Sequence, residues 1–168
     1  MTFATHKDFM RHLKTTIKRQ PIPPKFNPKD WKEKRFNCYA YAMRACMDFR
    51  NIPDNMFPRP GFISKGELSD HYSLTSKYIL KYFKKDCKAL GLRALRTTLT
   101  EKLSENEYKI AVYCSECDDF HFIRQDSNGK WSEKDGWNKP INIVHEKEIE
   151  KDHYNYKFLG IFKVSKAG

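Results

Sequence analysis

Hydrophobic residues recur at helical spacing at the start of the chain. Within residues 6–19, Phe9, Leu13 and Ile17 are four positions apart and share one face of a helix, while the opposite face is basic. The Pro-Ile-Pro-Pro stretch at residues 21–24 cannot continue a helix and favours an extended segment. The pattern therefore predicts an amphipathic N-terminal helix followed by a linker.

Two more helices are expected in the first half of the chain. Residues 38–49 carry an apolar face rich in small alanines, and Asn37 just before them is a favourable N-cap residue. Residues 74–89 place Leu, Ile, Tyr and Phe at helical spacing, and Gly91 suits the position that follows a helix. The intervening residues 53–66 are rich in proline and glycine, which predicts a loop.

The second half of the chain changes to β-strand patterns, with β-branched and aromatic residues in short runs bounded by turn residues. Five strands are expected, at residues 92–95, 109–114, 120–125, 130–134 and 156–164. Helices that precede a run of antiparallel strands indicate an α+β fold, in which N-terminal helices pack on a small antiparallel β-sheet. The consecutive strands predict a meander.

Net charge bears on the expected partners. The chain has 32 Lys and Arg against 21 Asp and Glu, which gives a net charge of +11. Such a field attracts anions, including nucleic acid and anionic cell-wall polymers. The lysines are scattered along the chain, however, so a general enrichment of lysine from an AT-rich genome explains the charge as well as a dedicated polyanion site does.

Cysteine content and hydropathy suggest a location. Five cysteines, an odd number, argue against a closed disulfide framework. The N-terminal segment lacks the apolar run of a signal peptide, and no stretch approaches the ~18 apolar residues of a membrane helix. We therefore expect a cytoplasmic protein, or one that is released by lysis or delivered as a viral, phage or effector protein.

Two residues carry the chemistry of a thiol enzyme. Cys38 directly follows Asn37 at the expected start of a helix, where backbone N–H groups and the helix dipole stabilise a thiolate. The amide of Cys38 itself is placed to donate to an oxyanion. On the expected strand 120–125, Phe120 and Phe122 share one face, so His121 points to the other. An imidazole beside the thiol would remove its proton and later protonate a leaving group.

Ordinary structural roles are the alternative for both residues. A lone cysteine is usually a small core residue, and a lone histidine is more often structural than catalytic. The spacing of Cys38 and His121 along the chain does not show that they meet.

A resemblance to a known superfamily favours the catalytic interpretation. It rests on the segments Asn37-Cys38-Tyr39-Ala40-Tyr41-Ala42, Pro58-Arg59-Pro60-Gly61 and Phe120-His121-Phe122-Ile123-Arg124-Gln125-Asp126-Ser127-Asn128-Gly129-Lys130-Trp131-Ser132. Over residues 31–164 the chain resembles the NlpC/P60 and CHAP branches of the papain-like cysteine hydrolases, which include bacterial and phage-associated proteins. The resemblance implies a papain-like catalytic domain at residues 31–168, preceded by a basic helix and Pro-rich linker at residues 1–30. It further implies that Cys38 is the nucleophile and His121 the general base of a thiol peptidase or amidase.

Such enzymes place a third polar residue on the next strand, where it orients the imidazole. The matching position here is Glu133, whereas the family often has His at that place in a Trp-Ser-His-Lys stretch. A carboxylate can also accept from the ring and stabilise imidazolium. Asn138, Asp126 and Asp119 are alternative third residues, and an exposed charge on a hairpin is the alternative for Glu133.

Residues just upstream of the nucleophile are candidates for the cleft or the oxyanion site. Trp31 lies seven positions before Cys38, and Asn37 immediately precedes it. The resemblance implies that such residues line the cleft or assist the oxyanion site. The alternative for Trp31 is a packed aromatic residue.

The Cys114-Ser115-Glu116-Cys117 stretch is a single C-x-x-C pair, which supplies at most half of a zinc site. Cys87, His71, His145 or His153 would have to complete it. A redox-active pair and two reduced thiols in a turn are the alternatives. We expect no metal and no cofactor.

Three functions follow. The first is a cysteine hydrolase that cleaves an amide, peptide or isopeptide bond; acyl transfer by the same residues remains open. The second is a catalytically inactive papain-like module that binds a polyanion or a protein partner through its basic surface. The third is an effector that modifies a host protein.

Overall fold

A computed structural model describes residues 3–50, 58–66, 74–136 and 139–167. The α-helices come first along the chain and the strands follow, with one short 3-10 helix between the last two strands. The helices are α1 (His6–Arg19), α2 (Cys38–Ala42), α3 (Phe62–Lys65) and α4 (Ser76–Ala89), with short 3-10 helices η1 (Pro28–Trp31) and η4 (Glu146–Glu148). The strands are β1 (Leu92–Thr97), β2 (Glu107–Ser115), β3 (Asp119–Gln125), β4 (Trp131–Lys134), β5 (Ile141–Val144) and β6 (Lys157–Lys166).

The six strands form one antiparallel sheet in the order β1-β6-β2-β3-β4-β5. The α+β class is therefore confirmed. The expected meander holds for β2 to β5 only, because the C-terminal strand β6 inserts between β1 and β2. The sequence pattern also missed β5, which is short and partly exposed on both faces.

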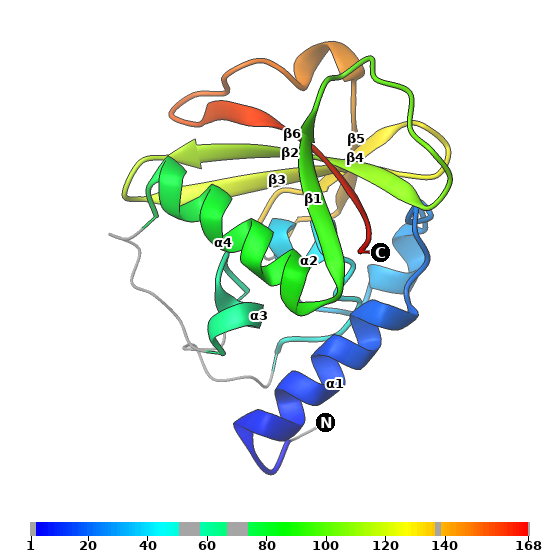
Figure 1. Ribbon diagram of the computed structural model, residues 1–168, viewed down its shortest axis with the longest axis vertical. Coiled ribbons are helices and arrows are strands. Elements are labelled where there is room, and N and C mark those ends of the chain that lie inside the picture. The colour runs from blue at the N-terminus through cyan, green and yellow to red at the C-terminus, as the bar shows by residue number, and fades with distance from the viewer. Residues whose placement is uncertain (1–2, 51–57, 67–73, 137–138, 168) are drawn as a thin grey trace.

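Helices cover one face of the sheet. In Figure 1, α4 packs across the sheet, with α3 beside it and α1 extending from the lower right of the view. The principal core lies between these helices and sheet residues such as Phe120, Phe122 and Phe162. A smaller cluster that includes Tyr113, Trp131 and Ile149 lies on the opposite face of the sheet.

The N-terminal helix belongs to the principal core. Its predicted bounds are confirmed, and its apolar stripe of Phe9, Leu13 and Ile17 is buried. Thr5 caps its first turn by accepting from the N–H of Asp8. At its other end the guanidinium of Arg44 donates to the carbonyl of Gln20 at 2.8 Å, which ties the helix to the segment after α2.

The predicted helix at residues 38–49 is wrong in length, because α2 ends at Ala42. Arg44 adopts a left-handed backbone with φ of 63°, and this conformation stops the helix. The turn lets the buried Arg44 side chain reach the end of α1, so a tertiary contact overrides the local helical pattern.

The other helix and strand predictions are close to the observed bounds. Helix α4 begins at Ser76 rather than at residue 74, because the Thr75 side chain accepts from the N–H of Tyr78 and caps the first turn. Gly91 follows that helix with a left-handed φ of 74°, as predicted. The loop predicted at residues 53–66 lies partly outside the described residues and contains α3.

A buried carboxylate joins three helices. Asp86 on α4 is fully buried. It accepts from the Tyr39 hydroxyl at 2.6 Å, the Gly61 N–H at 2.9 Å and the Ser64 N–H at 2.8 Å. Burial raises the pKa of Asp86 above its ordinary value, although the three donors oppose that effect. This carboxylate therefore fastens α2 and the start of α3 to α4.

We expect Asp86→Ala to lower the free energy of unfolding by ~3 kcal/mol or more, because it leaves buried donors without an acceptor. Urea unfolding followed by circular dichroism measures the change. Lys88→Ala, at an exposed position on the same helix, is the matched control and should shift stability by less than ~0.5 kcal/mol. Equal effects of the two substitutions would contradict this account of Asp86.

Candidate active site

Cys38 is the first residue of α2, and its side chain lies against strand β3. The side-chain oxygen of Asn37 accepts from the Ala40 N–H at 2.9 Å and caps the helix. The amide of Asn37 donates to the Pro58 carbonyl at 2.6 Å, so both ends of this side chain are engaged in positioning the helix. Cys38 is 6% exposed, and its sulfur lies 4.0 Å from the Phe120 carbonyl.

His121 lies on β3, next in sequence to that carbonyl. Phe120 and Phe122 pack into the principal core, and His121 turns to the opposite face, as the alternation predicts. Its strand partner is Tyr113 on β2, whose ring centroid is 6.1 Å away. The side chain of His121 is 18% exposed, so most of the ring is shielded from solvent.

Glu133 on β4 contacts the histidine. Its Oε2 lies 2.6 Å from Nε2 of His121, and the two side chains are about equally exposed. This distance is typical of a charge-assisted hydrogen bond. The strand register explains the contact, because Arg124 pairs with Ser132 and this brings the two side chains onto the same face.

The charge of His121 depends on both neighbours. Burial by itself lowers its pKa, but hydrogen bonding and charge interactions with Cys38 and Glu133 outweigh burial and raise the pKa to about 10. The imidazole is therefore protonated at neutral pH. A sulfur, an imidazolium and a carboxylate are thus arranged in sequence across α2, β3 and β4.

A buried polar network holds these three elements together. Nε of Arg124 on β3 donates to Oδ1 of Asp126 at 2.9 Å, and both side chains are almost completely buried. The other oxygen of Asp126 accepts from the Ser132 hydroxyl on β4. Ser132 also bonds the Tyr41 hydroxyl on α2 at 2.7 Å.

The guanidinium of Arg124 makes further contacts with α2. It donates to the Tyr41 carbonyl at 3.0 Å and lies 3.7 Å from the centre of the Tyr41 ring. It also donates to the carbonyl of Lys25 in the N-terminal linker at 3.2 Å. The network therefore fixes the end of α2 against the strands that carry His121 and Glu133.

The alternative third residues are placed elsewhere. Asp126 is bonded to Arg124 and Ser132. Asp119 accepts from the Phe120 N–H and from the Tyr156 hydroxyl at 2.6 Å. Asn138 lies outside the described residues. Of the candidates that the structure describes, Glu133 is the one bonded to the imidazole.

Trp31 is a packed aromatic residue that also lines a cavity. It is 5% exposed, and its ring contacts Phe36 at a centroid distance of 4.5 Å and Tyr41 at 5.1 Å. The remaining part of the ring faces the larger of the cavities described below.

A cavity of about 340 Å³ opens beside the imidazole. Sequence reasoning missed the side chains that join His121 and Glu133 in its lining, including Tyr113, His153 and Tyr156. The alternation of side chains along β2 offered a signal for Tyr113, because that residue pairs with His121 across the sheet. His153 and Tyr156 were noted only as a possible metal ligand and as the start of the last strand, and no local pattern placed either beside His121.

Among the described residues, no group of three or more His, Cys, Asp or Glu side chains is arranged so that it could hold a metal ion, and this includes the C-x-x-C pair. Cys114 is buried and donates to the Leu74 carbonyl at 3.5 Å, whereas Cys117 is exposed. His71 lies outside the described residues. Within the same described ranges, no helix is long and apolar enough to cross a membrane.

We expect the His121 ring to remain an imidazolium at pH 8, because its partners raise the pKa to about 10. Glu133→Gln should lower that pKa, since it removes the negative partner and keeps the shape of the side chain. Ring nitrogen chemical shifts followed by NMR against pH measure this directly, with His121→Asn identifying the signal. Glu105→Gln, at an exposed carboxylate away from the site, should leave the titration unchanged. Equal titrations in wild type and Glu133→Gln would contradict the coupling.

We expect Arg124→Met to cost about 3–5 kcal/mol of stability, because it leaves the Asp126 carboxylate buried without its cation. The double variant Arg124→Met/Asp126→Leu should cost less than this single change, since it removes both buried charges. Urea unfolding curves of the three proteins test this. A double variant that is less stable than the single one would refute the buried-charge explanation.

Comparisons with known proteins locate the chain in a family. The profile of the family described as "Domain of unknown function (DUF7689)" matches residues 29–158, a range that contains Cys38, His121 and Glu133. The chain is 31% identical over 121 residues to "Insoluble matrix shell protein 1" of Ruditapes philippinarum, a match that covers 67% of this chain and 66% of that protein. The match thus spans slightly less than two thirds of the relative. No solved structure shows a significant match. Because the family profile covers more than half of the chain, the protein belongs to the DUF7689 family.

Proposed function

We propose that the protein is a papain-like cysteine hydrolase that cleaves an amide, peptide or isopeptide bond. The observation that carries the proposal is the cysteine at the start of α2, 4.0 Å from the carbonyl of Phe120, next to a histidine that bonds Glu133 at 2.6 Å. A thiol beside a cationic imidazole favours the thiolate, which is the nucleophilic form. A carboxylate on the far side of the ring is the usual orienting group.

Each residue has a role in the proposed reaction. The Cys38 thiolate attacks the carbonyl carbon of the substrate, and the carbonyl π electrons move to oxygen. The amide of Cys38, at the first position of α2 where no intrahelical acceptor exists, donates to that oxyanion. When the tetrahedral intermediate collapses, the C–N bond breaks and His121 protonates the departing amine.

Water completes the cycle. His121, now neutral, takes a proton from a water molecule that attacks the thioester, and the C–S bond breaks to release a carboxylic acid and regenerate the thiolate. Glu133 keeps the ring oriented and stabilises its cationic form through both steps. An amine in place of water would give acyl transfer with the same residues.

The arrangement of the elements supports a papain-like scaffold. The cysteine starts a helix that packs on a sheet, the histidine lies on a neighbouring strand, and the third residue lies on the next strand of that sheet. This order follows the resemblance of residues 31–164 to the NlpC/P60 and CHAP enzymes. The name of the Ruditapes relative refers to an insoluble shell matrix, and an amide hydrolase or acyltransferase acting on protein material is compatible with it.

A basic cavity next to the site favours the second candidate function, an inactive scaffold that binds a polyanion or a protein partner. The large number of cationic side chains that line this cavity supports ligand binding with or without catalysis. Reactivity of Cys38 separates the two candidates, because a binding module does not need an activated thiol.

We expect Cys38 to be alkylated by iodoacetamide faster than Cys117 at neutral pH, because a cationic imidazole beside a thiol favours the reactive thiolate. Mass spectrometry of each cysteine against pH measures the rates. His121→Ala should slow Cys38 at neutral pH by roughly tenfold or more, because the cation that favours its thiolate is gone.

Cys117 is the internal control, since it is exposed and lies in the turn before β3. Its alkylation rate should follow that of an ordinary thiol in both proteins. If Cys38 reacts no faster than Cys117 at neutral pH, or if His121→Ala leaves its rate unchanged, the hydrolase proposal fails.

A further inference from the structure

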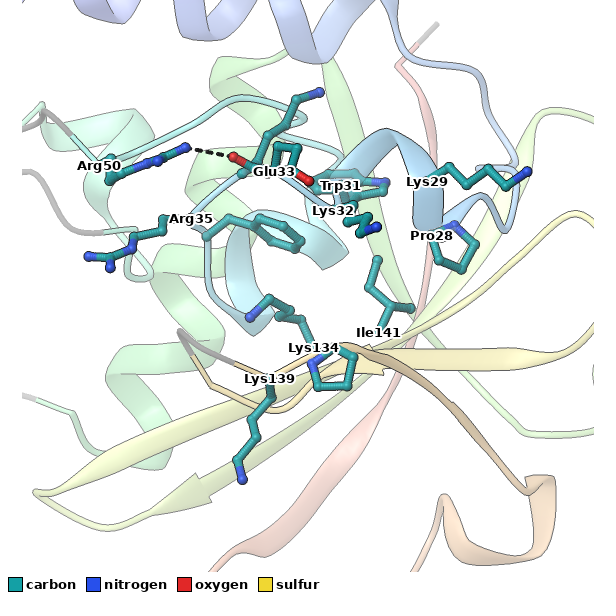
Figure 2. Close-up of a pocket in the computed structure, with 13 residues that line it drawn as sticks. Pro28, Lys29, Trp31, Lys32, Glu33, Arg35, Arg50, Lys134, Lys139 and Ile141 are labelled. Carbon is teal, nitrogen blue, oxygen red and sulfur yellow. Dashed lines mark hydrogen bonds between the residues drawn. The ribbon is translucent and has the colours of Figure 1, made fainter.

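A groove of about 580 Å³ is lined by η1, the residues after it and the residues around the β4–β5 connection. One wall comes from η1 and the segment that follows it, including Trp31, Lys32 and Arg35. Figure 2 shows Trp31 and Lys32 on the opposite side of the groove from Lys134, at the end of β4, and Ile141, at the start of β5, whereas the side chains of Arg35 and Lys139 extend outward from the rim. The groove therefore lies between the segment that leads into α2 and the strands that follow the histidine.

Positive charge dominates this groove. Its lining has one acidic residue, Glu33, and seven basic ones: Lys29, Lys32, Lys34, Arg35, Arg50, Lys134 and Lys139. Arg50 is neutralised by Asp48 at 2.7 Å and also donates to the Glu33 carbonyl, as Figure 2 shows. The lining keeps a large excess of cations, and this charge favours the binding of an anionic ligand.

Four of these cations are exposed and are paired with no acidic side chain of the described residues: Lys29, Lys32, Arg35 and Lys139. They lie on both walls, so a ligand in the groove meets cations from two directions. Such an arrangement suits a chain of several negative groups better than a single small anion.

The groove borders the segments that carry the candidate site. Phe36, in its lining, is two residues before Cys38. Lys134, also in the lining, follows Glu133 on β4 and donates to the carbonyl of Gly136. A ligand in the groove therefore contacts residues next in the chain to the segments that hold Cys38 and Glu133.

The aromatic residues of the groove argue against nucleic acid. Single-stranded nucleic acid is commonly held by bases that stack on accessible aromatic rings. Trp31 is 5% exposed and Phe36 is 1% exposed, and their rings pack on each other. A thiolate, moreover, attacks acyl carbon, which the nucleic-acid backbone lacks, whereas a polypeptide supplies both carboxylates and amide carbonyls.

We infer that this groove binds an acidic stretch of polypeptide, rich in Asp and Glu, and that it selects substrates whose scissile amide lies next to such a stretch. The inference rests on the proposed hydrolase function for its second half. Lysine ammonium groups and Arg35 meet the carboxylates at the groove walls, and the part of the ligand that extends beyond the groove presents its amide to Cys38.

Fluorescence anisotropy tests the binding half. The protein is the full chain with Cys38→Ser, which prevents turnover. The probes are a fluorescein-labelled peptide of alternating Glu and Gly, the same peptide with Gln in place of Glu, and a single-stranded DNA of equal charge. The groove variant adds Lys32→Gln and Lys139→Gln, and its matched control adds Lys77→Gln and Lys88→Gln on exposed positions of α4, which gives the same net charge.

We expect the Glu peptide to bind the Cys38→Ser protein and the Gln peptide to bind it at least roughly tenfold more weakly. The groove variant should lose roughly tenfold in affinity for the Glu peptide, and the α4 control should lose less than about twofold. Equal losses in the two variants would overturn the assignment of the groove. Tighter binding of DNA than of the Glu peptide, lost in the groove variant alone, would overturn it in favour of nucleic acid.

Alkylation of Cys38 separates this inference from the proposed function. The groove substitutions in a chain that retains Cys38 should leave its alkylation rate within about twofold, because neither lysine contacts the sulfur, histidine or carboxylate. A reactive Cys38 without binding of the Glu peptide would contradict the groove inference and leave the proposed hydrolase function standing. An inert Cys38 with groove-dependent binding would overturn the substrate assignment and leave a binding module.

Discussion

The buried ion pair between Arg124 and Asp126 is the contact on which the arrangement of the site depends. Its guanidinium bonds the Tyr41 carbonyl of α2, and its carboxylate bonds Ser132 of β4, so one pair spans the helix of Cys38 and the strands of His121 and Glu133. Removing two charges from water costs several kcal/mol per ion, so such a pair adds little net stability by itself. Its effect is positional, because an arrangement that separated the two groups would leave a buried charge unpaired. Apolar packing alone would tolerate small shifts of α2 over the sheet. The polar network does not tolerate such shifts, because they would break its buried hydrogen bonds.

A second set of contacts places the other end of the same helix. The Asn37 side chain caps the first turn of α2 and also donates to the Pro58 carbonyl. Asp86 on α4 accepts hydrogen bonds from Tyr39 of α2 and from Gly61 at the start of α3. Helix α2 is only five residues long and cannot be stable in isolation. Polar side chains from four other segments hold it, which explains how so short a helix can present one cysteine at a defined position. Its shortness is also what frees Arg44 to cap α1.

The site combines strong local charge with different surroundings on its two sides. Around the imidazole the surface is aromatic, with Tyr113 and Tyr156 in the lining. The basic groove has Lys134, the residue after Glu133, in its lining, and at about 580 Å³ it is larger than the cavity of about 340 Å³ beside the imidazole. A substrate that met both would be anionic along one part and would present a carbonyl at the junction. Seven of the 32 basic residues line this one groove, a grouping that the scattered lysines of the sequence did not reveal.

Local periodicity determined much of the fold. The apolar stripe of α1, the left-handed Gly91 after α4 and the alternation that turns His121 away from the core all follow from residues close together in the chain, so the sequence predicts them. Cys38 and His121 were recognisable as candidates for the same reason, since a helix start and a strand face are local features. Tertiary structure alone decided that β6 inserts between β1 and β2 and that Arg44 ends α2, and it selected Glu133 from the third residues that the sequence left open. These outcomes depend on contacts between segments far apart in sequence, whose energies local spacing does not encode. The groove is the clearest example, because its two walls lie about a hundred residues apart in the chain and become one charged surface only when the sheet and α2 pack together.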